Sequence, residues 1–166
     1  MGCGMNIALI LSGGVGSRMP AEVPKQYIRV GGRMILTRCA ERLFRHPLVH
    51  AVQIVAAREW QDAIRAELPE DGGGKWAGFS QPGENRQSSI YHGLLDISRY
   101  AGPEDTVLVH DAVRPCVSEG LITACFAAME GHDGVLPVLP MTDTVYYSEG
   151  GQAVDRLLRR EKASAG

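Results

Sequence analysis

A short apolar run followed at once by a cluster of glycines constrains this chain most. Ile7–Leu11 is apolar and partly β-branched, which predicts a buried strand. Glycines 13, 14 and 16 then allow a sharp turn whose backbone N–H groups can converge on an anion. Arg18 and Lys25 add positive charge just downstream. The stretch predicts a cradle for a polyphosphate; a tight turn with two solvated cations is the alternative.

The loop does not match the two standard nucleotide-binding fingerprints. No Gly-Lys-Ser/Thr sequence closes it, as a P-loop requires, and Gly14-Val15-Gly16 is not followed by a third glycine three residues on. The loop alone therefore does not identify the ligand.

Composition narrows the class of protein. The chain has 166 residues, which fits one domain spanning 1–166, and 45% of them are hydrophobic, enough for a sizeable core. A net charge of −2 predicts no general nucleic-acid or membrane surface. The four cysteines form no C-x-x-C pair and are expected to be reduced thiols. With neither a signal peptide nor an apolar run of about 18 residues, we expect a cytoplasmic protein.

Periodicity along the chain predicts alternating strands and helices. Further strands are expected at 49–57, 75–81, 106–110 and 134–140, and helices at 35–44, 60–68, 90–97 and 121–129, with an exposed glycine-rich loop at 69–74. Alternation around Gly150-Gly151 predicts a β-hairpin over about 142–158 that projects toward a partner. The fold class is therefore α/β, with a mostly parallel twisted sheet, helices on both faces and a hairpin arm.

Two more polar segments follow predicted strands. The segment 83–89 runs into a helix, whose free N–H groups favour a polar or anionic ligand, although an ordinary helix cap is the simpler interpretation. The strand 106–110 ends at Asp111, where open α/β sheets bind ligands, and its carboxylate suits Mg²⁺. An ion pair between Asp111 and Arg114 is the alternative, and His110 is expected to be a packed or hydrogen-bonded residue.

Three separated motifs occur in order: G-G-V-G-S-R with P-K-Q-Y, then G-E-N-R-Q-S-S, then V-H-D-A-V-R-P. Together they closely resemble the family of 2-C-methyl-D-erythritol 4-phosphate and ribitol-5-phosphate cytidylyltransferases, over nearly the whole chain. The resemblance implies a Rossmann-like nucleotidyltransferase fold, CTP and Mg²⁺. It also implies attack by a polyol phosphate on the α-phosphorus of CTP, release of pyrophosphate, and a homodimer formed through the β-arm.

The resemblance also implies roles for individual residues. Arg18 and Lys25 would act on the phosphates, Asp111 would bind the metal, and an arginine of the 156–160 cluster would orient the incoming phosphate, Arg160 in preference to Arg156. Arg114 and Thr144 would shape the polyol-phosphate side. The nucleotide would contact Leu11, Ser12, Gly13, Gly14, Gly16, Gly83, Glu84, Asn85, Arg86, Ser88, Ser89 and Ala112.

The chain departs from the family in two respects. Its loop reads Leu11-Ser12-Gly13-Gly14 where the family usually has P-A-A-G or L-A-G-G, and this form with Trp60 leans toward the ribitol branch. Family members also continue past residue 166 with elements that carry another substrate-binding lysine, so we expect the C-terminal part of the family domain to be absent here. A nucleotidyltransferase using another NTP, and a truncated nucleotide-binding domain without activity, therefore remain alternatives.

Overall fold

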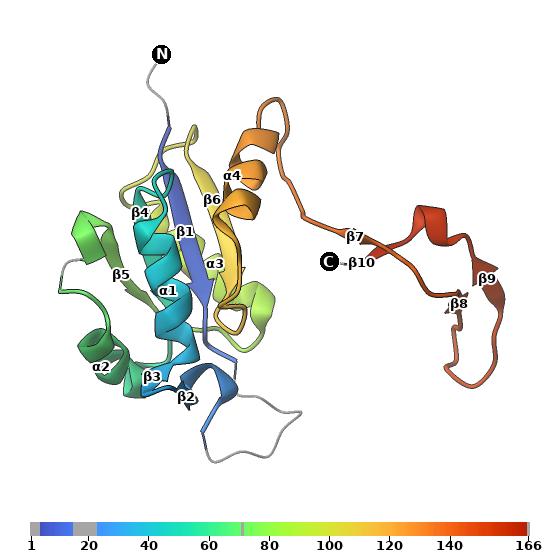
Figure 1. Cartoon of the computed structure of the whole chain (residues 1–166), viewed down its shortest axis with the longest axis horizontal. Helices are drawn as coiled ribbons and strands as arrows, with labels where there is room; N and C mark the ends of the chain where they lie inside the picture. Colours follow the sequence, from blue (N-terminus) through green and yellow to red (C-terminus); the bar gives the residue numbers. More distant parts are fainter. Residues whose placement is uncertain (1–3, 15–22, 71, 166) are drawn as a thin grey trace. The chain divides into compact units, whose positions relative to one another are not determined.

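A computed structural model describes residues 4–14, 23–70 and 72–165. The chain divides into two compact units, residues 1–123 and 124–166, and each is described by itself. The first unit holds the main sheet, and the second holds the short strands near the C-terminal end of the chain (Figure 1).

Four parallel strands form the sheet of the first unit. They are β1 (Asn6–Leu11), β4 (Ala51–Val55), β5 (Trp76–Ser80) and β6 (Thr106–Asp111), in the order β5-β4-β1-β6. The central strand β1 is fully buried from residue 7 to residue 10, as its apolar run predicts. Because all four strands run the same way, the segments that follow them meet at one edge, the carboxyl edge.

Helices cover both faces of this sheet, as predicted. The helices are α1 (Ile35–Arg45), α2 (Arg58–Glu67), α3 (Arg86–Ile97) and α4 (Glu119–Ala128). Ile7, Leu9 and Val55 pack with Ile97 of α3 on one face. Ile10 is equally buried, and because side chains alternate along a strand it faces the opposite side, where α1 crosses the sheet (Figure 1).

A short hairpin links the glycine loop to α1. The 3₁₀ turn η1 (Lys25–Tyr27) leads into β2 (Arg29–Val30) and β3 (Arg33–Met34), which pair antiparallel. Gly31 and Gly32 form the turn between them with φ of 57° and 79°, a conformation that glycine adopts without strain.

One expectation about the connecting segments held in part, and another was wrong. In the glycine-rich loop, Pro69, Glu70, Gly73 and Gly74 are exposed as expected, but Gly72 of the 3₁₀ segment η2 (Gly72–Gly74) is buried against the ring of Phe44. A strand was expected over 134–140, but only β7 (Leu139–Pro140) pairs, with β10 (Ser164–Ala165). Pro137 and Pro140 lack the N–H that a strand ladder requires, which explains why the apolar pattern does not produce a longer strand.

The second unit contains the predicted hairpin. Strand β8 (Val145–Tyr147) pairs antiparallel with β9 (Arg156–Leu158), and the 3₁₀ turn η3 (Arg160–Lys162) follows. The connecting loop is closed by Asp155, which accepts a hydrogen bond from the backbone N–H of Glu149 at 2.6 Å. The hairpin prediction over 142–158 is therefore confirmed as local structure.

Within the described residues, the helices are too short or too polar to span a membrane. Cys39, Cys116 and Cys125 are free thiols there, in agreement with the expectation for these three residues, and Cys3 lies outside the description.

Candidate active site

The glycine loop leaves β1 at the carboxyl edge of the sheet, where Ser12 is held tightly. Its N–H and its hydroxyl both donate to the carbonyl of Val55, at 2.9 and 2.5 Å, and the residue is buried. The Ser12 N–H is therefore occupied by the protein. Within the described part of the chain, the N–H groups of Gly13 and Gly14 have no such partner and are the donors that this loop can offer. Gly16 and Arg18 lie outside the described residues, so their roles stay predictions.

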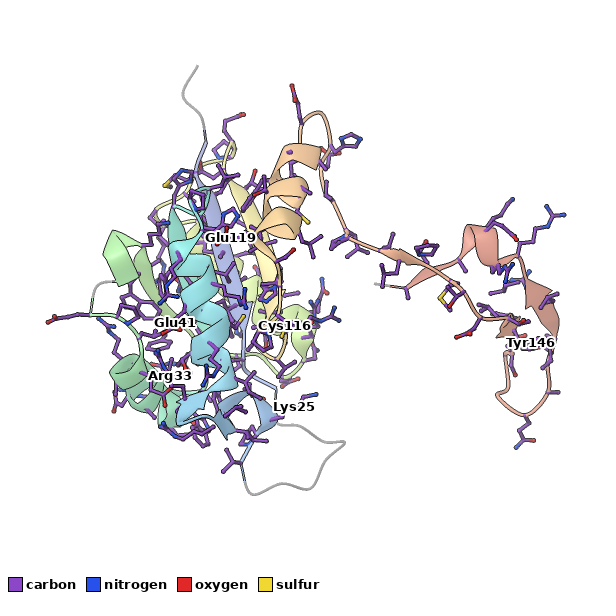
Figure 2. All side chains as sticks on the ribbon, viewed as in Figure 1. Lys25, Arg33, Glu41, Cys116, Glu119 and Tyr146 are labelled. Carbon is purple, nitrogen blue, oxygen red and sulfur yellow. The ribbon has the colours of Figure 1, made fainter. Side chains whose placement is uncertain are left out.

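The buried side chains of Gln26 and Tyr27, which follow the loop, donate hydrogen bonds to its carbonyls. The sequence motif alone did not identify this role. The Gln26 amide donates to the carbonyls of Ser12 and Gly14, both at 2.7 Å, and the Tyr27 hydroxyl donates to Ser12 at 2.9 Å. The neighbouring Lys25 is exposed on the side of the sheet where β1 ends (Figure 2). The signal available in the sequence was the P-K-Q-Y motif, which places both side chains directly after Lys25.

The second polar segment packs directly against the first. A Cβ added to Gly13 would lie 2.3 Å from Cβ of Pro82, so the proline ring packs closely against the backbone of Gly13. At the next residue, the N–H of Gly83 donates to the hydroxyl of Ser89 at 3.0 Å, which holds this loop against α3. The predicted loop-to-helix junction therefore lies beside the glycine loop.

An open hollow of about 590 Å³ lies at this junction. Asn85 caps α3, because its side chain accepts from the N–H of Ser88 at 2.8 Å while the Ser88 hydroxyl accepts from the N–H of Asn85. The ordinary helix cap foreseen in the sequence is thus present, and the hollow lies beside it. Its lining residues are Pro82, Gly83, Glu84, Asn85, Ser88 and His92.

The third polar segment follows β6, next to β1. The N–H of Ala112 donates to the carbonyl of Leu11 at 3.1 Å, and Ala112 is buried against that strand. His110 donates from Nε2 to the carbonyl of Arg114 at 3.1 Å, and burial lowers the pKa of this imidazole despite the opposing effect of that bond. His110 is therefore a packed, hydrogen-bonded residue, as expected.

Asp111 lies between two arginines. Its two carboxylate oxygens lie 3.2 Å from Nη2 of Arg86 and 3.4 Å from Nε of Arg114. The ion pair with Arg114, one of the two interpretations of the sequence, is present, and Arg86 joins it from the start of α3. Asp111 is 31% exposed and the arginines are 62% and 64% exposed, so solvent screens these pairs and all three side chains remain available to a ligand.

The donor set at Asp111 limits what metal could bind. No cluster of three or more His, Cys, Asp or Glu side chains occurs among the described residues, so a closed protein cage for a metal is not formed there. Mg²⁺ is commonly held by one or two carboxylates together with substrate phosphates. Asp111, a partly exposed carboxylate at the carboxyl edge, fits that second arrangement.

The remaining predicted site residues belong to the second unit. Arg160 donates to the carbonyl of Thr142 at 3.3 Å, two residues before Thr144. Arg156 stacks over the ring of Tyr147 at 4.7 Å within the hairpin, so its guanidinium already has a partner there. The roles of Thr144 and Arg160 toward a substrate stay predictions.

Three polar loops thus follow β1, β5 and β6 at one edge of a parallel sheet, with glycine N–H groups, arginines and the carboxylates of Glu84 and Asp111. This arrangement defines an α/β protein of the class that binds ligands outside the carboxyl ends of its strands.

Comparison with known proteins identifies the family. A family model described as 2-C-methyl-D-erythritol 4-phosphate cytidylyltransferase (IspD) matches residues 6–164. The chain therefore belongs to this family, as the three motifs indicated.

Individual relatives agree with this assignment. The 2-C-methyl-D-erythritol 4-phosphate cytidylyltransferase of Geobacter metallireducens is 37% identical over 145 residues, which are 87% of this chain and 62% of that protein. A ribitol-5-phosphate cytidylyltransferase from Lacticaseibacillus paracasei is 28% identical over 156 residues, 94% of this chain and 67% of that protein. The crystal structure of 4-diphosphocytidyl-2C-methyl-D-erythritol synthase from Anaerococcus prevotii superposes with a TM-score of 0.78 at 27% identity, covering 97% of this chain and 66% of that one.

Proposed function

We propose that this protein transfers a cytidylyl group from CTP to a polyol phosphate, 2-C-methyl-D-erythritol 4-phosphate, and releases pyrophosphate. Membership of the family over residues 6–164 is the observation that carries the proposal. The chain spans 62% of the length of its Geobacter metallireducens relative, so the activity of this chain is itself part of what must be tested. A cytoplasmic location belongs to the same proposal.

In this proposal the two packed loops bind CTP. The N–H groups of Gly13 and Gly14 would donate to the nucleotide, because the neighbouring Ser12 N–H is already occupied. The hollow at Gly83–Ser88 would receive the cytosine and the ribose, and it adjoins the glycine loop through the contact of Pro82 with Gly13. Base and phosphates would therefore bind to one continuous surface.

The chemistry requires neutralisation of charge more than acid–base groups. The attacking group is a phosphate anion, so an oxygen of the polyol phosphate can form a bond to the α-phosphorus of CTP while the bond to the leaving pyrophosphate breaks, with no proton to remove. Two anions must approach each other, and positioned cations lower this barrier. We assign this role to Lys25 and Arg18, with Arg114, Thr144 and Arg160 on the side of the polyol phosphate.

Mg²⁺ is the metal that we assign to Asp111. When bound, it would neutralise phosphate charge and orient the triphosphate. Arg86 and Arg114, which now pair with the carboxylate, are long and exposed enough to contact the phosphates as well.

The experiment is a coupled assay of pyrophosphate release with CTP and Mg²⁺, with 2-C-methyl-D-erythritol 4-phosphate or ribitol 5-phosphate as acceptor. We expect turnover with the first acceptor. Thermal-shift measurements with the four NTPs should show the largest stabilisation by CTP, and a preference for UTP or GTP would reject a cytidylyltransferase. If CTP binds but this chain releases no pyrophosphate while a chain of full family length does, it is a nucleotide-binding domain without activity.

Ribitol 5-phosphate is the second candidate acceptor. The similarity to the ribitol-5-phosphate cytidylyltransferase of Lacticaseibacillus paracasei favours it, because that relative is matched over 94% of this chain. Faster pyrophosphate release with ribitol 5-phosphate than with 2-C-methyl-D-erythritol 4-phosphate would establish this alternative.

Lys25 provides the sharpest test of the assigned roles. We predict that Lys25→Ala lowers kcat by about 10²- to 10³-fold and changes the Kd of CTP much less, because its charge would act on the transition state. Lys75→Ala is the matched control: it removes the same charge from a lysine that donates to the carbonyl of His46, before β5 and away from the carboxyl edge. Equal losses in kcat and CTP affinity for Lys25→Ala would mean that Lys25 only binds the ground state.

The hairpin arm supports a proposed homodimer. Tyr146, Val154 and Leu157 are 59%, 61% and 64% exposed, which is unusual for large apolar side chains within one small hairpin. Light scattering should give twice the chain mass, and a monomer at micromolar concentration would reject the dimer.

A further inference from the structure

The Gln26 side chain is a buried amide placed between two carbonyls of the glycine loop. It is 4% exposed, and its Nε2 lies 2.7 Å from the carbonyl oxygen of Ser12 and 2.7 Å from that of Gly14. Both amide hydrogens are therefore directed at the loop. A primary amide is the neutral side-chain group that can donate two hydrogen bonds from one nitrogen.

Tyr27 completes this support from the next position in η1. Its hydroxyl donates to the same Ser12 carbonyl, and its ring stacks on Trp60 of α2 with centroids 4.3 Å apart and planes 16° apart. With the two bonds to Val55, every polar group of Ser12 has a partner. Ser12, the first residue of the loop, is therefore held in place by the protein without a ligand.

The direction of the Ser12 carbonyl determines the direction of the next N–H. In a trans peptide the C=O of one residue and the N–H of the following residue point to opposite sides of the chain. Because Gln26 and Tyr27 both draw the Ser12 carbonyl toward themselves, the N–H of Gly13 points away from them. Among the described residues of the loop, this N–H and that of Gly14 are the donors left for a ligand.

We propose that Gln26 is a positioning residue for nucleotide binding: it holds the carbonyls of Ser12 and Gly14, and so keeps the N–H of Gly13 turned outward, without touching the nucleotide. The inference rests on the proposed function for the identity of the ligand but not for the behaviour of the loop. A loop that is already ordered loses less entropy when it binds a triphosphate, which raises affinity.

The test compares three substitutions with one control. Gln26→Leu removes both donors, and Gln26→Glu keeps the shape but places a carboxylate against two carbonyl oxygens. Tyr27→Phe removes one bond to Ser12 and retains the stacked ring, so the protein should stay folded. The control Gln61→Leu removes a comparable amide that donates to the carbonyl of Ala56 at 2.9 Å rather than to the loop.

The first measurement is the ¹⁵N order parameter of Gly13 and Gly14 without ligand. We expect about 0.85 in the parent protein and below about 0.6 in both Gln26 variants. Tyr27→Phe should give an intermediate value for Gly13, and Gln61→Leu should leave both glycines unchanged. Unchanged order parameters in the Gln26 variants, or the same decrease in Gln61→Leu, would overturn the proposal.

The second measurement is calorimetric titration with CTP and Mg²⁺. Loss of two hydrogen bonds to the loop should weaken CTP binding on the order of tenfold in Gln26→Leu, and more in Gln26→Glu. If the parent protein does not bind CTP, the proposed function fails, while the order parameters still decide the role of Gln26. If the parent protein binds CTP and both Gln26 variants bind it equally well, the positioning role fails alone.

Discussion

The contact between the glycine loop and Pro82 gives a quantitative prediction from two adjacent glycines. Neither Gly13 nor Gly14 has a φ in the left-handed region, so alanine is compatible with both backbones. A Cβ on Gly13 would lie 2.3 Å from Cβ of Pro82, whereas a Cβ on Gly14 meets no described atom within 4 Å. The same substitution therefore has opposite consequences one residue apart.

The magnitude follows from the geometry. Carbon atoms pack best at about 3.5–4.0 Å, so Gly13→Ala must separate the two loops by more than roughly 1 Å. Cβ of Pro82 is fixed to the backbone by the ring and cannot rotate away, and overpacking of this kind costs about 1–3 kcal/mol. Both variants also gain about 0.4–1 kcal/mol from the lower entropy of the unfolded chain. Gly13→Ala should therefore lower the free energy of unfolding, and Gly14→Ala should leave it equal or slightly raised.

Urea denaturation followed by circular dichroism measures the difference. We expect Gly13→Ala to be less stable than Gly14→Ala by about 1–3 kcal/mol, a difference from which the unfolded-chain effect cancels. Equal midpoints for the two variants would refute the argument, because they would mean that the two loops are not in contact in solution. CTP affinity measured on the same samples would show whether that contact also matters for the ligand.

Two further predictions concern the carboxyl edge and the cysteines. Asp111→Asn should weaken the Mg²⁺-dependent part of CTP binding measured by calorimetry. CTP binding in EDTA should be unchanged or stronger, because Arg86 and Arg114 lose their carboxylate partner. An unchanged dependence of CTP binding on Mg²⁺ would remove Asp111 as the metal ligand. Burial raises the pKa of the Cys39 thiol to about 12, so at pH 8 this thiol stays protonated and enclosed. Iodoacetamide should therefore modify the exposed Cys116 well before Cys39, as measured by peptide mass spectrometry. Equal rates of modification would show that α1 opens readily.

Much of the fold could be predicted because its signals are local. The apolar run at 7–11 and the periodicity of 35–44 identify β1 and α1, since burial of one face imposes a repeat on neighbouring residues. The strand expected at 134–140 was wrong for the opposite reason: an apolar pattern does not supply the backbone donors and the partner that a ladder needs.

The candidate site likewise has features that the sequence predicts and features that it does not. The sequence by itself determined the three polar loops and their place after strands, because glycines, charges and strand ends are visible in neighbouring residues. Only the tertiary structure decided that Gly13 touches Pro82, that Arg86 shares Asp111 with Arg114, and that Gln26 holds the carbonyls of Ser12 and Gly14. These contacts join residues that are separated along the chain, and whether two such groups meet depends on how the connections fold and how the strands are ordered in the sheet, not on local pattern.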